Sequence, residues 1–140
     1  MTAQVEDIFT ADLTNVQDRM LLGLTRAKEI WVLAALADRK QRLLMAHELH
    51  AYGLFSLNQL AKICRISVPT VCRHMKKNAV GGKFEPEVLS QLVYLRKLVI
   101  VNQPIPVSFI KGAVETGTSV STIARLTGAS ETNLYLKVKQ

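Results

Sequence analysis

The spacing of apolar residues predicts that the chain is helical along most of its length. Between 25 and 36, Ala27, Ile30, Trp31 and Ala34 recur at intervals that place them on one face of a helix. We expect this helix to begin near residue 14 or 15, and Gly23 to kink or divide it. We assign no structure to residues 1–13, where polar residues interrupt the apolar ones.

Three further stretches have the pattern of single helices. Residues 38–51 carry Leu43 and Leu49 as partly inward side chains, and Gly53 suits the left-handed position that follows a helix end. Residues 86–101 contain more apolar side chains than one partner face can cover, which predicts a long central helix packed on both sides. Residues 106–116 follow after a break at 102–106.

Residues 56–77 (SLNQLAKICRISVPTVCRHMKK) have the organisation of a helix-turn-helix. Ser56 is placed to cap a helix over 57–64, and Ser67 a second helix from 68 to about 77, because each hydroxyl can accept from an unpaired backbone N–H. Apolar positions line one face of each helix, and Ala61 is small where the two helices must cross. Two caps this close leave room only for a tight turn.

The same pattern recurs 63 residues later in the chain. Aligning Ser56 with Ser119 also pairs Ala61 with Ala124, and the other capping and apolar positions agree. We therefore predict a second helix-turn-helix in the tail, with 106–116 as its leading helix. The chain ends soon after this second motif, which would also be the case for a truncated sequence.

Together these patterns predict an all-α fold in which two helix-turn-helix units are joined by a long apolar helix. The expected parts are an N-terminal helical segment (1–37), a first helix-turn-helix domain (38–83), and a linker helix with a second helix-turn-helix-like domain (84–140). Residues 78–83, which contain two consecutive glycines, are the expected linker after the first domain.

Positive charge is concentrated around the first motif. The 140-residue chain has a formal net charge of +7. Nine Lys and Arg residues lie between 39 and 83 against one acidic residue, Glu48, whereas residues 1–18 hold four acids and no base. This distribution is typical of a surface that binds the phosphates of a nucleic acid. Arg39, Lys40 and Arg42 begin the helix over 38–51 and are also placed to reach a phosphate.

The sequence offers no pattern for catalysis, a cofactor or a metal. Cys64 and Cys72 are the only cysteines, and neither they nor the three histidines have metal-ligand spacing. Paired carboxylates near a histidine and phosphate-binding loops are absent. Charges interrupt the apolar runs before the roughly eighteen residues that a membrane span needs. We expect a non-enzymatic protein without cofactor or membrane contact, in a reducing compartment.

Residues 61–75 (AKICRISVPTVCRHM) resemble the DNA-binding helix-turn-helix of serine resolvases and invertases. In that family a small residue precedes the turn by four positions, as Ala61 does here. A hydroxyl, an apolar, an aromatic and a basic residue follow the turn, in the places of residues 70–73. This sequence departs at two positions, because Cys72 replaces the aromatic residue and Arg65 replaces a glycine in the turn.

We therefore expect a sequence-specific DNA-binding regulator whose first recognition helix reads double-stranded DNA through two sets of side chains. The residues expected at base edges are Ser67, Val68, Pro69, Cys72 and Arg73. The residues expected on the phosphate backbone are Arg65, Thr70, Lys76 and Lys77. Arg73 is the expected guanine reader, since a guanidinium pairs with guanine through two hydrogen bonds.

Compared with the first copy, the second helix-turn-helix has a more favourable residue in its turn but charged side chains that are less suited to DNA. Its candidate DNA contacts are Ser130, Thr132, Asn133, Tyr135 and Lys137. Gly128 occupies the turn, and Tyr135 restores the aromatic of the resolvase pattern. Glu131 near the start of the helix is unfavourable beside phosphates, and Leu136 stands where the first copy has Arg73. A packing or protein-contact role therefore stays open for this helix.

The two-unit layout resembles the immunity repressors of actinobacterial temperate phages. The resemblance implies a monomer that binds an asymmetric operator in the cytoplasm of the bacterial host and blocks transcription by occluding the polymerase. Two alternatives remain. One is a homodimeric regulator on a palindrome, with the helix over 86–101 as its interface. The other is a helix-turn-helix scaffold used for protein–protein interaction.

Overall fold

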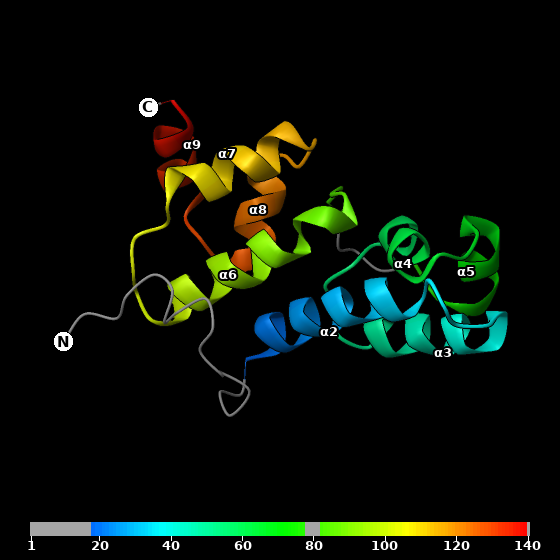
Figure 1. Cartoon of the computed structure of the whole chain (residues 1–140). Coiled ribbons are helices and arrows are strands. Elements are labelled where there is room, and N and C mark those ends of the chain that lie inside the picture. The colour runs from blue at the N-terminus through cyan, green and yellow to red at the C-terminus, as the bar shows by residue number, and fades with distance from the viewer. Residues whose placement is uncertain (1–17, 78–81, 140) are drawn as a thin grey trace.

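The computed structural model describes residues 18–77 and 82–139, and these residues form helices joined by short connections (Figure 1). The α-helices are α2 (Arg19–Leu33), α3 (Arg39–His50), α4 (Leu57–Cys64), α5 (Val68–His74), α6 (Leu89–Ile100), α7 (Val107–Glu115), α8 (Val120–Thr127) and α9 (Glu131–Val138). A 3-10 turn, η1 (Pro86–Val88), precedes α6. No strand occurs in the described residues, so the predicted all-α class is confirmed.

Side-chain caps set the starts of most of these helices. An oxygen of the N-cap residue accepts from a backbone N–H in the first turn at Asp18, Asp38, Ser56, Ser67, Ser119 and Ser130. Asp38 also forms a capping box, in which the side chain of Gln41 accepts from the Asp38 N–H at 3.1 Å. The four serines are the caps expected from sequence, so both short helix pairs begin where the pattern places them.

Helix α2 differs from its expected form at both ends and at Gly23. It begins at Arg19 and ends at Leu33, while the expected start near residue 14 lies outside the described residues, as do residues 1–13. Gly23 is buried inside the helix, which continues through it without a break. A Cβ at Gly23 would lie 2.5 Å from Leu54 Cδ1. The glycine therefore serves close packing against the loop after α3.

Helix α5 is shorter than the sequence pattern suggests. It ends at His74, and Met75 has an extended backbone, so Lys76 and Lys77 follow the helix instead of lying on it. The side chain of Met75 is still buried. The expected linker over 78–83 lies outside the described residues except for Gly82 and Lys83.

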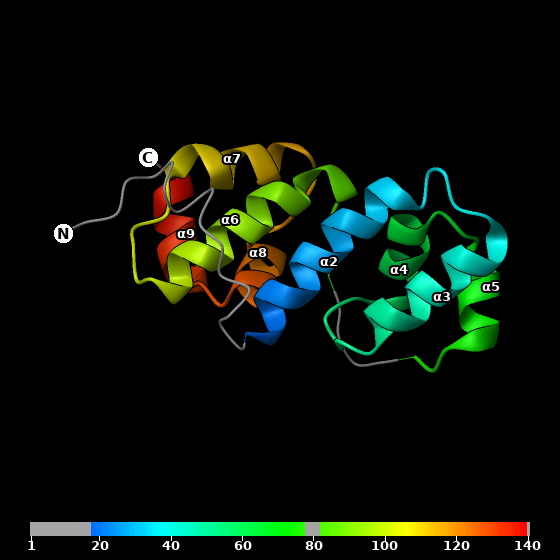
Figure 2. The ribbon, with the colours of Figure 1, turned by 60° about the horizontal axis from the view of Figure 1, so that its bottom comes forward.

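The helices form two similar units, α2–α5 and α6–α9. Helix α8 lies 63 residues after α4, and α9 begins 63 residues after α5. Both helix-turn-helix turns pass through a left-handed residue, Arg65 in the first (φ 60°) and Gly128 in the second (φ 75°). In both ribbon views α2 and α6 pack side by side and run in opposite directions, with α5 and α9 at opposite ends of the molecule (Figures 1 and 2).

The predicted long apolar helix that would join the two units is not confirmed. The 86–101 stretch divides into the turn η1 and the twelve-residue helix α6, which packs within the second unit on α7 and α8. Helix α2 contacts α3 and α4 of the first unit and also α6 and α8 of the second. The pair α2 and α6 therefore joins the units. Apolar content alone did not show which helices α6 would contact.

One continuous hydrophobic core runs through both units. It includes residues from every α-helix, among them Ile30 on α2, Leu60 on α4, Leu95 on α6 and Ile123 on α8, each with no exposed side-chain surface. An ion pair supplements it between the units, because Arg96 Nη2 on α6 lies 2.6 Å from Asp18 Oδ2 at the start of α2. None of the described helices has the length and apolar character to cross a membrane.

Candidate nucleic-acid interface

Helix α5 presents a row of small and polar side chains to solvent. Val71 and Met75 point into the core and hold the helix against α4, with Val71 fully buried. The side chains on the outward surface are those of Ser67, Val68, Pro69, Cys72 and Arg73, and each is exposed. The structure therefore brings together, on one accessible surface, the residues that the sequence analysis assigned to base edges.

Thr70 lies inside this surface. The residue is 7% exposed, and its hydroxyl lies 2.6 Å from the Ser67 hydroxyl. Arg73 Nη2 donates to Thr70 Oγ1 at 3.3 Å. Thr70, the third residue of α5, faces the protein, so it is directed at its neighbours and away from the outer surface. Its hydroxyl orients the Arg73 guanidinium, one turn further along the helix.

Arg65, which the sequence analysis placed on the phosphate backbone, is occupied by contacts within the protein. Its Nε and Nη2 donate to the carbonyl of Trp31 at 3.2 and 3.0 Å, and the guanidinium carbon lies 3.8 Å from the centre of the Trp31 ring. Arg42 Nη1 donates to the Arg65 carbonyl at 3.2 Å. These contacts offset the cost of a left-handed backbone at a residue other than glycine.

Exposed cations flank both ends of α5. Arg39 and Lys40 begin α3, while Lys76 and Lys77 follow α5, and all four are exposed. None of them pairs with a carboxylate within residues 18–77 and 82–139. His50 on α3 contacts the Lys76 carbonyl at 3.0 Å and so positions this segment beside α3.

A hollow of about 300 Å³ lies between the start of α3 and the start of α5. It is lined by Arg39, Arg42, Arg65, Ile66, Ser67 and Thr70. Arg42 Nε donates to the Ala34 carbonyl at 2.7 Å, so the side chain of Arg42, like that of Arg65, is held by hydrogen bonds within the protein. Arg39 and Arg65 are both exposed, and Arg65 is engaged by Trp31. Arg39 was expected from sequence to reach a phosphate, but nothing in the spacing places residue 39 beside residue 67.

The second recognition helix, α9, is held on α8 in the same manner. Ser130 caps it by accepting from the Asn133 N–H at 3.4 Å, and Leu134 is its buried anchor. Thr132, Asn133 and Tyr135 are exposed. The Lys137 ammonium donates to the Ile105 carbonyl at 2.8 Å, so that charge is used to hold the loop before α7.

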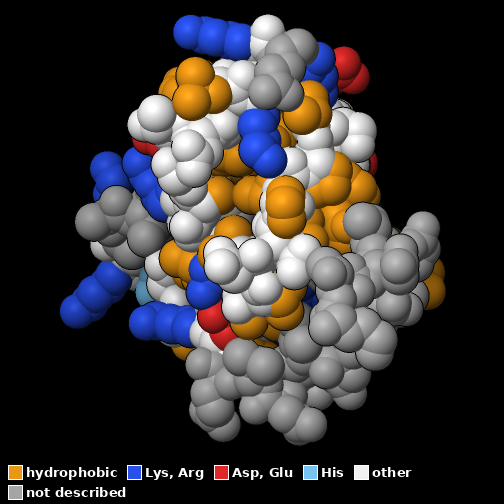
Figure 3. Space-filling model, turned by 90° about the vertical axis from the view of Figure 1, so that its left-hand side faces the viewer, with side chains coloured by type: hydrophobic (Ala, Val, Ile, Leu, Met, Phe, Trp, Pro, Cys, Tyr) orange, Lys and Arg blue, Asp and Glu red, His pale blue; other side chains and the backbone are white. Residues whose placement is uncertain are grey.

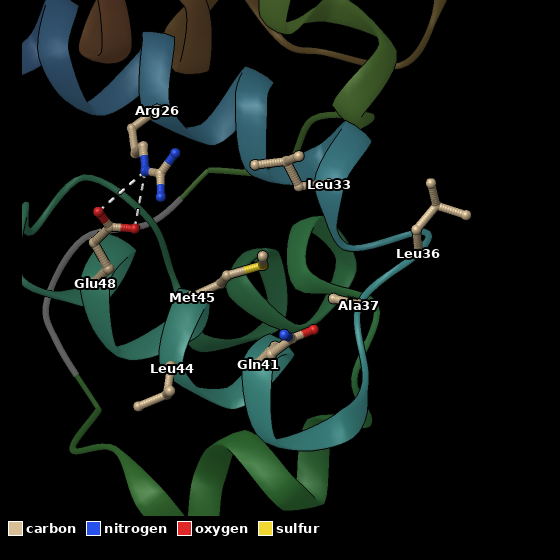
Figure 4. A pocket seen from close by; sticks show the side chains of 8 residues that line it. All are labelled: Arg26, Leu33, Leu36, Ala37, Gln41, Leu44, Met45 and Glu48. Carbon is tan, nitrogen blue, oxygen red and sulfur yellow. Dashed lines mark hydrogen bonds and ion pairs between the residues drawn. The ribbon is translucent and has the colours of Figure 1, made fainter.

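A second, apolar hollow lies between α2 and α3 (Figure 4). Its lining includes Leu33, Leu36 and Leu44, which are 49%, 96% and 61% exposed. Arg26 and Glu48 at one end pair with each other at 2.9 Å. This hollow of about 510 Å³ offers apolar contact area and little free charge.

The described residues contain no group of three or more His, Cys, Asp and Glu side chains arranged to hold a metal ion. Cys64 is buried, and desolvation raises the pKa of its thiol to about 12, whereas Cys72 is exposed on α5. Cys64 is therefore a core side chain, as its place in the apolar pattern indicates. The two thiols differ in their exposure to solvent although they lie only eight residues apart in the sequence.

No family model, curated protein or solved structure matches this chain. The chemistry of the exposed surfaces is therefore the basis on which a function is proposed.

Proposed function

We propose that this protein is a sequence-specific double-stranded DNA-binding regulator that blocks transcription by occupying promoter DNA. The observation that carries the proposal is the surface of α5, on which side chains suited to base edges are exposed together, with the exposed cation Arg39 beside the start of the helix and the exposed Lys76 and Lys77 after its end. A recognition helix in the major groove requires this order, with phosphate contacts on either side of the base contacts.

The side chains on this surface have separable roles. Arg73 donates to guanine O6 and N7, with Thr70 holding one of its nitrogens. Val68 and Pro69 at the start of the helix make apolar contacts with base edges. Lys76 and Lys77 at one end, with Arg39 and Lys40 at the other, neutralise phosphates. Arg65 supports the turn through Trp31.

The two units predict how the operator is organised. Because α5 and α9 carry different side chains, a chain that uses both reads two unlike half-sites, and one monomer binds one asymmetric site. This organisation is what the resemblance to phage immunity repressors implies. The apolar side chains of α6, which a dimer was expected to use, are buried within the chain, including Leu92, Leu95 and Leu98.

Selection of bound sites from random duplex DNA tests the proposal, followed by the stoichiometry of the complex on the selected sequence. We expect one enriched asymmetric sequence bound by one chain. The affinity should fall linearly with salt on logarithmic axes, with a slope of about −0.9 for each phosphate neutralised. A selection that enriches no sequence would contradict the proposal.

Two variants separate base reading from phosphate binding. Arg73→Ala should cost about 1–3 kcal/mol of binding free energy and relax the preference at one base position. Lys77→Ala should weaken binding to all sequences about equally and lower the salt slope by about one. Equal loss on every sequence for Arg73→Ala would show that this arginine contacts only the backbone.

One observation favours the alternative of a protein-contact role. The hollow between α2 and α3 exposes Leu33, Leu36 and Leu44 without free charge of its own (Figure 4). If it binds a protein or a second copy, Leu36→Ser together with Leu44→Ser should abolish that association and leave DNA affinity unchanged. An apolar contact of this kind should respond little to salt, in contrast to phosphate contacts.

A further inference from the structure

Helices α5 and α9 occupy equivalent places in their units, so their outward surfaces can be compared residue by residue. Ser130 corresponds to Ser67 as the cap, Leu134 to Val71 as the buried anchor, and Gly128 to Arg65 in the turn. Residues 132, 133, 135 and 136 then form the exposed face of α9. Of these, residues 132, 135 and 136 correspond to the outward residues 69, 72 and 73 of α5, whereas Asn133 corresponds to Thr70 and differs from it in being exposed.

Both charged side chains within α9 are engaged by the protein. The Glu131 carboxylate accepts from the Ser121 hydroxyl at 2.6 Å, which turns it toward α8. The Lys137 ammonium donates to the Ile105 carbonyl on the opposite side. Glu131 is thus drawn away from phosphates, and Lys137 is withdrawn from base edges. The unfavourable carboxylate that the sequence suggested is accommodated by this contact.

The side chains that remain exposed are Thr132, Asn133, Tyr135 and Leu136, with the last two 46% and 58% exposed. Seen from the end of the molecule at which α9 lies, hydrophobic and other uncharged side chains cover much of the surface, with separate Lys and Arg side chains among them (Figure 3). This exposed set lacks the guanidinium or ammonium that pairs with guanine O6 and N7.

The chemistry of this set matches adenine and thymine. An asparagine amide pairs with adenine N6 and N7 through two hydrogen bonds, and a threonine methyl or an aliphatic side chain contacts the thymine C5-methyl. Thr132, Asn133 and Leu136 are all exposed, and Asn133 also lines the hollow that α9 forms with the loop before α7. The equivalent face of α5 carries Arg73 and is suited to guanine.

We propose that α9 reads A·T base pairs, so that the operator consists of a guanine-containing half-site read by α5 and an A·T half-site read by α9. The proposal rests on the DNA-binding function proposed above and adds the identity of the second half-site. Asn133 contacts adenine, and Leu136 contacts the methyl group of a neighbouring thymine. Lys139, exposed at the end of the helix, contacts phosphate.

The test compares the sequence preferences of the full chain with those of Asn133→Ala, Leu136→Ala and Arg73→Ala, each determined by selection from random duplex DNA. Ser108→Ala, at an exposed position of α7 outside the proposed contact residues, is the control. Circular dichroism establishes that each variant is folded. Affinities are then measured on the selected site and on versions with one half-site scrambled.

We expect Asn133→Ala to lose its preference at A·T positions and to bind the selected site about five- to 150-fold more weakly, the range expected for one bidentate base contact. Scrambling the A·T half-site should remove this difference, and Arg73→Ala should act on the other half-site. Ser108→Ala should match the unmodified chain.

Two results would overturn the inference while leaving DNA binding intact. One is a selected site on which Arg73→Ala weakens binding but both α9 variants bind normally, which would assign α9 to packing or protein contact. The other is loss of preference at G·C positions for Asn133→Ala. Failure of the unmodified chain to enrich any sequence is a different result, and it would overturn the proposed function itself.

Discussion

Replacing Asp18 by asparagine should separate the ion pair between the two units from the helix cap that the same residue provides. Asp18 Oδ1 accepts from the Leu21 N–H at 2.7 Å, and both carboxylate oxygens accept from Arg96, at 3.1 and 2.6 Å. Asparagine caps a helix about as well as aspartate. Asp18→Asn therefore retains the cap and removes the charge that faces Arg96.

The expected loss is about 2 kcal/mol in the free energy of unfolding, because a hydrogen bond to a charged group contributes about 1.5–3 kcal/mol. The two side chains are only 14% and 18% exposed, so solvent screens the pair little. Arg96 keeps a second acceptor, the Thr127 carbonyl at 3.0 Å, which keeps the cost below that of leaving a charge fully unpaired. Asp18→Ala should cost about 1 kcal/mol more, since the cap is then lost as well.

The pH dependence provides an independent check. Hydrogen bonding from Arg96 lowers the pKa of Asp18 below its ordinary value of 3.8. A lowered pKa means that the stabilisation is fully present above the unfolded-state pKa and is lost as the pH falls through the folded-state pKa. The difference in stability between the unmodified chain and Asp18→Asn should therefore be constant from pH 7 to about pH 5 and shrink below pH 3.8.

Urea denaturation followed by circular dichroism, repeated across this pH range, measures both quantities. Asp38→Asn is the matched control, because Asp38 caps α3 with a capping box and its side chain is exposed. We expect Asp38→Asn to change stability by less than about 0.5 kcal/mol. Equal losses for the two variants, or an Asp18→Asn deficit that does not shrink at all as the pH falls below 3.8, would refute the assignment of this energy to the Arg96 pair.

Two further predictions concern the first unit. Gln59 is buried and exchanges hydrogen bonds with the backbone of Phe84, at 2.8 and 3.2 Å. Gln59→Ala should therefore lower the free energy of unfolding in urea by about 2 kcal/mol, because both backbone groups are left unpaired. Asn58→Ala, at the adjacent exposed position, should change this free energy little. In the folded protein a thiol reagent at pH 8 should modify Cys72 quickly and Cys64 only on unfolding, because burial raises the pKa of the Cys64 thiol to about 12. Mass spectrometry of the labelled peptides measures the order of modification, and labelling of Cys64 before Cys72 would contradict the prediction.

Local sequence determined the helices and their starts. Serine followed by an apolar helical repeat is a short-range signal, and the caps at Ser56, Ser67, Ser119 and Ser130 lie where it predicts them. The 63-residue repeat is likewise a property of the sequence alone, and it was sufficient to predict that two equivalent pairs of short helices exist. The exposed face of α5 followed from the same apolar spacing.

Tertiary structure decided how these elements are used. Apolar content identified residues 86–101 as buried but could not show that α6 packs on α2, because helices that are distant in sequence choose partners by the shape of their surfaces. The same applies to charge. Arg65 and Lys137 are basic residues at plausible DNA-contact positions, yet each donates to a carbonyl about thirty residues away.

The sequence by itself therefore determined which segments are helical, where the four short helices of the two motifs begin and that the helix-turn-helix pattern occurs twice, since caps and periodicity act within a few residues. Only the tertiary structure decided which cations remain free for a partner and which hold the fold. That distinction depends on distances between segments that are far apart in the chain, and these distances cannot be read from the amino-acid composition.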